Sequence, residues 1–112
     1  MDKEEFFKFL EDTYAKCVET SRKKNADYAG DSDPFANFRL VEMLGICSVE
    51  TGILVRMTDK MARITNLLKD GKTNQVKDET VDDTVLDLSV YSVILMAWRK
   101  QKGKNVSLPD KK

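Results

Sequence analysis

The feature that most limits the fold of this chain is the apolar segment spanning residues 84–98. Successive residues of a helix are rotated by about 100°, so Tyr91, Ile94 and Trp98 share one face, and the second half of the segment is apolar on other faces too. A helix of this kind must be covered by other elements on more than one side. We therefore expect a helical fold that surrounds this segment, with a second copy of the chain covering part of it.

Two acids lie at the start of this segment, one directly before it and one within its first turn. Asp83 and Asp87 lie one helical turn apart, on the strip that also carries Tyr91 and Trp98. We expect both carboxylates to face the packed side, where two like charges are costly unless cations, hydrogen-bond donors or a metal ion compensate them. Glu79 precedes Asp83 by four residues, so the three acids are a candidate ligand set for one divalent ion. The alternative is that Asp83 caps the helix, Glu79 compensates the helix dipole and Asp87 forms an ion pair.

The composition restricts the chemistry that is open to this chain. It has no histidine, which removes the commonest general base and zinc ligand, so a bound metal would be an oxygen-preferring ion such as Mg²⁺ or Mn²⁺. Because 19 basic residues balance 19 acidic ones, we expect no stable binding of duplex nucleic acid. No apolar stretch is long enough for a bilayer span, and the N-terminus lacks a signal-peptide pattern, so we expect no membrane partner and a cytoplasmic location.

Helical periodicity divides the chain into four expected helices, each with a start or stop signal. They span approximately residues 2–24, 33–44, 48–69 and 80–103. The signals are a capping box at Asp2, N-caps at Asp33 and Ser48, and glycine stops at Gly45 and Gly103. Turn-forming residues predict a loop over residues 25–32.

The absence of internal repeats and of alternating strand patterns favours an all-α fold resembling a four-helix bundle. We expect a single domain over residues 1–104 and a flexible tail over residues 105–112. Because the last helix is apolar on more than one face, we expect a homodimer or a higher homo-oligomer.

Two further groups of side chains could take part in binding. One group is Arg56, Asp59, Lys60 and Arg63, in which Arg56 to Asp59 and Asp59 to Arg63 have the spacing of intrahelical ion pairs. A solvated charged face would explain this pattern equally well. If this face meets the acids of the last helix, it places guanidinium groups for phosphate oxygens beside carboxylates for a metal. Groups that could contact a base and a sugar flank the expected loop: Lys24, Asn25, Asp27, Tyr28 and Asn37.

Four short motifs carry a resemblance to a known family. They are Lys24-Asn25-x-Asp27-Tyr28, Asp33-Pro34-Phe35-x-Asn37-Phe38, Arg56-x-x-Asp59-Lys60-x-x-Arg63 and Asp82-Asp83-Thr84-x-x-Asp87-Leu88-x-x-Tyr91. Together, over about residues 20–95, they resemble the nucleotide modification associated domain type 1 family, which is frequent in bacteriophages and prophages. That family looks like a distant relative of the MazG-like all-α nucleoside triphosphate pyrophosphohydrolases, which pair acids on two neighbouring helices and bind magnesium. Where those enzymes have a glutamate-x-x-glutamate group, this chain has Asp59 among basic residues.

The resemblance implies a magnesium-dependent pyrophosphohydrolase acting on a nucleoside or deoxynucleoside triphosphate in phage nucleotide metabolism, in the host cytoplasm. Asp83 and Asp87 would be its catalytic acids, and the metal would be held by Asp59, Glu79, Asp83 and Asp87. The substrate-binding residues would be Lys24, Asn25, Asp27, Tyr28, Asn37, Arg56, Lys60, Arg63 and Tyr91. Two other interpretations stay open: a phage protein that binds or sequesters a nucleotide without turnover, and a helical protein-interaction module.

Overall fold

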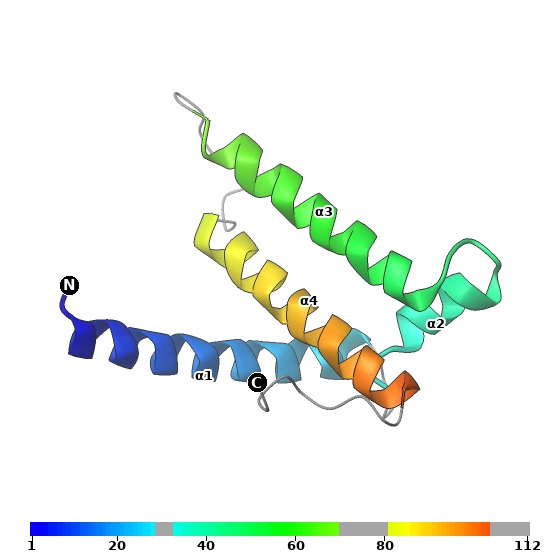
Figure 1. The fold of residues 1–112 in the computed structure, drawn as a ribbon, viewed down its shortest axis with the longest axis horizontal. Helices are drawn as coiled ribbons and strands as arrows, with labels where there is room; N and C mark the ends of the chain where they lie inside the picture. The colour runs from blue at the N-terminus through cyan, green and yellow to red at the C-terminus, as the bar shows by residue number, and fades with distance from the viewer. Residues whose placement is uncertain (29–32, 70–80, 104–112) are drawn as a thin grey trace. The chain divides into compact units, whose positions relative to one another are not determined.

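The described part of the chain is almost entirely helical. The computed structural model describes residues 1–28, 33–69 and 81–103, without the side chains of residues 25–28. Its elements are α1 (Lys3–Tyr28), α2 (Ala36–Met43), α3 (Val49–Leu67) and α4 (Val81–Lys102) (Figure 1). The predicted all-α, bundle-like class is confirmed. Among these residues, no helix combines the length and the apolar composition needed to cross a membrane.

The chain divides into two compact units, Met1–Ala36 and Asn37–Lys112. The first unit holds α1, and the predicted capping box starts it: the Asp2 N–H donates to Glu5 Oε1 at 2.9 Å, and the Glu5 N–H donates to Asp2 Oδ1 at 2.8 Å. The expected single domain over residues 1–104 stays a prediction. The expected tail lies outside the described residues.

The predicted end of the first helix was wrong. We expected it at about residue 24, followed by a loop over residues 25–32, but α1 continues to Tyr28. Asn and Asp cost less than about 1 kcal/mol each inside a helix, whereas each added residue gains a hydrogen bond once the helix is formed. Turn-forming side chains alone therefore do not end a helix that is already long.

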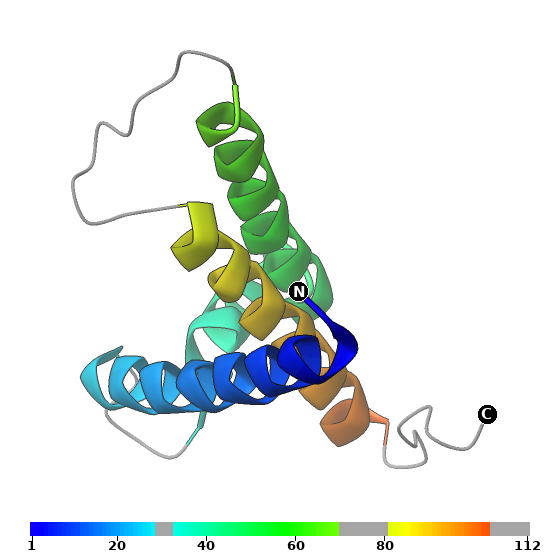
Figure 2. The same ribbon diagram turned by 90° about the vertical axis from the view of Figure 1, so that its left-hand side faces the viewer.

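The second unit is built on the antiparallel pair α3 and α4, which lie side by side in every view (Figures 1 and 2). The predicted N-cap is confirmed, because Ser48 Oγ accepts the Thr51 N–H at 3.1 Å. The buried side chains of this pair are Val49 and Ile53 on α3 and Thr84 and Trp98 on α4. The core between the two helices is small, and polar contacts along its edge contribute to fixing their register.

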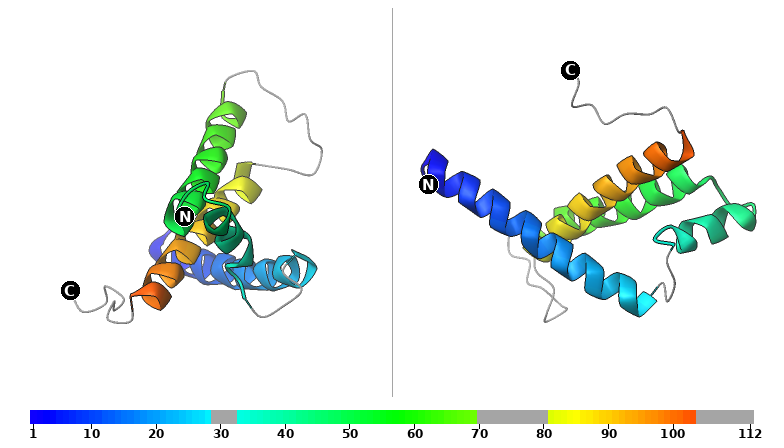
Figure 3. Two further views of the ribbon diagram at one scale, coloured as in Figure 1. Left: turned by 90° about the vertical axis from the view of Figure 1, so that its right-hand side faces the viewer. Right: turned by 90° about the horizontal axis from the view of Figure 1, so that it is seen from below.

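α2 lies beside the first turns of α3 (Figure 3), and a glycine allows its close approach. A Cβ atom built at Gly52 would lie 3.6 Å from Phe38 Cδ1 and 3.9 Å from Cys47 Sγ. The Phe38 ring also meets the Tyr91 ring edge-on, with centroids 6.4 Å apart. Phe38 therefore contacts a residue of α4 while lying close to the backbone of α3.

The glycine stops predicted at Gly45 and Gly103 are confirmed. Gly45 has φ +75°, and the N–H groups of Gly45 and Ile46 donate to the carbonyl oxygens of Glu42 and Val41 at 2.9 and 3.1 Å. The Gly103 N–H donates to the Arg99 carbonyl oxygen at 3.0 Å, directly after α4. These bonds satisfy carbonyl groups that the ends of α2 and α4 would otherwise leave unpaired.

The predicted start of the second helix was early by two residues. The Asp33 carboxylate accepts the Phe35 N–H at 2.9 Å, so Pro34 and Phe35 form a turn and α2 begins at Ala36. A short side chain that caps the N–H two residues ahead closes a turn of its own, which delays the helix.

Several apolar side chains remain exposed on the second unit. Met61 on α3 and Leu68 directly after it are 54% and 63% exposed. Leu40, Met43 and Ile46, on α2 and the turn after it, are also exposed. The predicted homo-oligomer would cover surface of this kind and stays a prediction.

Two glycine substitutions test this packing. Replacing Gly52 with Ala should raise the free energy of unfolding by about 0.5–1 kcal/mol, since a methyl group fits at ordinary contact distance and removes the conformational freedom of an internal helical glycine. Replacing Gly45 with Ala should lower it by about 1 kcal/mol, because the backbone there is left-handed. Urea unfolding of the whole chain measures both. A destabilised Gly52→Ala variant would mean that Phe38 packs more tightly than described.

Candidate functional site

Charged residues of α3 meet α4 along one line of contact. Lys60 Nζ lies 3.4 Å from Asp87 Oδ2, and Arg56 Nη2 donates to the Tyr91 hydroxyl oxygen at 3.5 Å. A step of four residues on α3 thus matches a step of four on α4, as antiparallel helices require. We call these four residues the α3–α4 seam. The sequence left open whether the basic face of the third helix was solvated or met the fourth helix, and for Arg56 and Lys60 it meets the fourth.

The same register extends one turn beyond Lys60. It brings Arg63 to the level of Asp83 and Thr84. Thr84 takes the buried position of this turn, with 2% of its surface exposed, and Arg63 is partly exposed. The seam and Arg63 therefore carry three cations on one side of α3.

The ion pair between Lys60 and Asp87 is only partly shielded from solvent. The two side chains are 21% and 31% exposed, respectively. Their 3.4 Å separation is longer than the 2.7–2.9 Å typical of a strong charge-assisted hydrogen bond. Both side chains of the pair therefore keep part of their surface in contact with solvent.

Arg56 is held over an aromatic surface. Its guanidinium carbon lies 5.8 Å from the centre of the Tyr91 ring, whose edge contact with Phe38 belongs to the same cluster. The hydrogen bond to Tyr91 raises the pKa of Arg56, and the charges of Asp59 and Asp87 act in the same direction. The guanidinium thus keeps its charge and its orientation toward α4.

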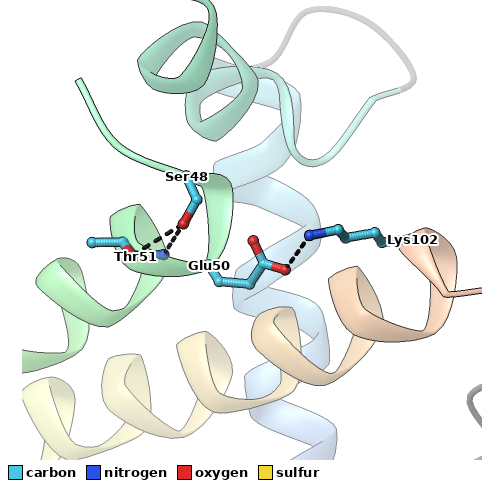
Figure 4. Close-up of polar contacts among 4 residues, drawn as sticks. All are labelled: Ser48, Glu50, Thr51 and Lys102. Atoms are coloured by element: carbon cyan, nitrogen blue, oxygen red, sulfur yellow. Dashed lines mark hydrogen bonds and ion pairs between the residues drawn. The ribbon is translucent and has the colours of Figure 1, made fainter. Parts of the chain in front are cut away.

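A second polar contact joins the opposite end of the helix pair. Lys102 Nζ lies 2.9 Å from Glu50 Oε2, linking the last turn of α4 to the first turn of α3 (Figure 4). Nearby, the Arg39 guanidinium lies 4.9 Å from the centre of the Trp98 ring, which links α2 to α4. The Lys102 ammonium lowers the pKa of Glu50, and Glu50 raises the pKa of Lys102. This end therefore also contributes to the alignment of α3 and α4.

The predicted metal ligands do not come together within the described residues. Asp83 is exposed, so the expectation that both acids of the last helix face the packed side was wrong for it: Thr84, the next residue, takes the inward position. Asp59 is exposed on α3, and Glu79 lies outside the described residues. In the described ranges, no group of three acidic or cysteine side chains is placed to hold a metal ion. The magnesium site stays a prediction, because Glu79 is one of its four predicted ligands.

The predicted base and sugar contacts fall in both units. Lys24 is exposed on α1, and Asn25, Asp27 and Tyr28 also belong to α1 instead of the expected loop, with side chains outside the description. Asn37 is exposed in the first turn of α2. Their roles stay predictions.

Two contacts at the ends of the helices were not predicted from the sequence. They are the ion pair of Glu50 with Lys102 and the contact of Arg39 with Trp98. A usable signal was present, since two consecutive helices of similar length that pack antiparallel bring the first turn of one beside the last turn of the other. An acid in that first turn and lysines in that last turn are therefore natural partners.

Comparison of the chain with protein-family models, with curated proteins and with solved structures gave no match. The interpretation of the site therefore rests on the geometry of the seam and on the motifs of the sequence.

The pKa shift of Glu50 predicts an acid-dependent loss of stability. A carboxyl group whose pKa is lowered by folding stabilises the protein fully above its ordinary pKa of 4.5, and this contribution is lost as the pH falls through the lowered value. Replacing Glu50 with Gln should destabilise the chain at pH 7 but have little effect at a pH well below the lowered pKa of Glu50. Urea unfolding at the two pH values measures the difference.

The Lys102→Met variant is the control, because it should reproduce the Glu50→Gln result at pH 7 and add little to it in the double variant. Equal losses at both pH values would show that the charge of Glu50 is not the cause.

Proposed function

We propose that this protein binds the phosphate groups of a nucleotide along the α3–α4 seam. The observation that carries the proposal is the arrangement of Arg56 and Lys60, which lie one turn apart on α3 and reach Tyr91 and Asp87 of α4. Arg63 continues the same face of α3. A row of cations against a partly exposed helix pair suits a linear polyphosphate better than a single carboxylate, since successive phosphates can meet successive cations.

The division of labour follows from the side chains. Arg56 offers a planar guanidinium beside Tyr91, which suits bidentate contact with phosphate oxygens. Lys60 supplies a compact charge at the centre of the row. Asn37 is an exposed amide one residue before Phe38, and we assign it to the base or sugar.

The motif resemblance supports the same ligand class. Arg56, Lys60, Asp87 and Tyr91 all belong to the motifs that resemble the nucleotide modification associated domain type 1 family. Binding through cations alone requires no metal, so a protein that holds or sequesters a nucleotide in phage-infected cells is our leading proposal.

Charge-neutral variants of α3 test this proposal. A nucleoside triphosphate should bind more tightly than the monophosphate, and the nucleoside should bind most weakly. Arg56→Met or Lys60→Met should each weaken triphosphate binding about tenfold or more, since each removes a charge-assisted hydrogen bond. Titration calorimetry in low salt with a chelator present gives the affinities.

Lys100→Met is the matched control, because Lys100 is an exposed lysine in the last turn of α4 and lies away from the seam. Its affinity should stay within about twofold of the unchanged chain. If all three variants lose the same affinity for the triphosphate, the binding is due to general charge attraction and not to the seam.

A second candidate function is hydrolysis of the triphosphate to monophosphate and pyrophosphate, with magnesium. It is favoured by Asp83 and Asp87, which lie one turn apart on α4 with one of them in the seam. Magnesium would supply charge neutralisation at the phosphates.

Hydrolysis is tested by incubating the protein with a panel of nucleoside and deoxynucleoside triphosphates and magnesium, and measuring released pyrophosphate. The hydrolase proposal predicts release that Asp87→Asn abolishes while triphosphate binding is retained. If a triphosphate binds tightly and is recovered unchanged, the hydrolase proposal is wrong. Nucleotide binding without turnover then remains the proposed function.

A further inference from the structure

The central ion pair of the seam sets up a competition for one cation. Lys60 is the middle cation of the row, and the Asp87 carboxylate lies 3.4 Å from its ammonium group. A phosphate that binds at the centre of the row needs the same ammonium group. The chain thus carries its own anion at the position where the ligand's anion would bind.

The geometry makes the pair exchangeable. Its separation exceeds that of a tight charge-assisted hydrogen bond, and both side chains are partly exposed, so an entering anion reaches Lys60 without unfolding either helix. Neighbouring groups favour the exchange, because a polyphosphate on Lys60 also reaches the level of Arg56, whereas the Asp87 carboxylate is fixed to its own helix. The ligand gains contacts that Asp87 does not make.

From this competition we infer that Asp87 is an internal competitor that occupies Lys60 and must be displaced when a nucleotide phosphate binds. The inference rests on the proposed function and adds a regulatory contact to it. Competition by Asp87 weakens the affinity for every anion that binds Lys60. Only a ligand with several phosphates gains enough contacts along the row of cations to bind. The opposite assignment, in which Asp87 contributes to binding, predicts that its removal weakens binding.

Removal of the carboxylate tests the inference. With a chelator present, Asp87→Asn should bind a nucleoside triphosphate and inorganic tripolyphosphate about three- to fivefold more tightly than the unchanged chain, as expected when a partly exposed ion pair no longer has to be broken. Asp82→Asn is the matched control, since it removes the same charge from the first turn of α4 at an exposed position. It should change the affinity less than twofold.

Lys60 must carry the effect if the competition is real. In a chain that already has Lys60→Met, adding Asp87→Asn should change triphosphate affinity no more than Asp82→Asn does. An equal gain with and without Lys60 would overturn the inference, because the gain would then come from general repulsion.

A measurement on the unchanged chain does not depend on the folding of any variant. The carboxyl carbon resonance of Asp87 should shift on addition of tripolyphosphate, and the Lys60 side-chain resonances should move with the same binding curve. Binding without a change at Asp87 overturns the inference and leaves the proposed function standing. Absence of binding by both the unchanged chain and Asp87→Asn overturns both.

Discussion

The structure of the second unit depends on the register between α3 and α4, and the Lys60–Asp87 and Arg56–Tyr91 contacts mark that register. The two helices share a core of few buried side chains, so apolar packing alone gives little resistance to sliding of one helix along the other. Polar pairs at fixed steps of one turn, with Glu50 and Lys102 at the far end, each favour a single alignment. The same contacts orient the cations that we assign to ligand binding, so alignment and binding share residues.

Much of the fold could be predicted from local signals. The capping box at Asp2, the N-cap at Ser48 and the stops at Gly45 and Gly103 each depend on a few adjacent residues, and the structure confirms all of them. The end of α1 could not be predicted in the same way, because propagation of a long helix outweighs the weak preferences of Asn and Asp. Local capping and turn signals therefore predict most helix boundaries, whereas the end of α1 depends on the cooperativity of helix formation.

The candidate site was less accessible to sequence reasoning. Periodicity placed Arg56 and Lys60 on one face of their helix but did not indicate whether that face meets solvent or α4, since ion-pair spacing is the same in both cases. It also assigned Asp83 to the packed side, although a rotation of one residue gives that position to Thr84. Such choices depend on the angular setting of one helix against another, which side-chain shape determines.

We propose that a phosphate binds at the α3–α4 seam and displaces Asp87 from Lys60. The most direct measurement is a titration of the isotopically labelled chain with a nucleoside triphosphate, followed by nuclear magnetic resonance. We expect the largest shifts at Arg56, Lys60, Asp87 and Tyr91, which lie together along the contact between α3 and α4. Shifts confined to the last turn of α4, at Arg99, Lys100 and Lys102, would contradict it.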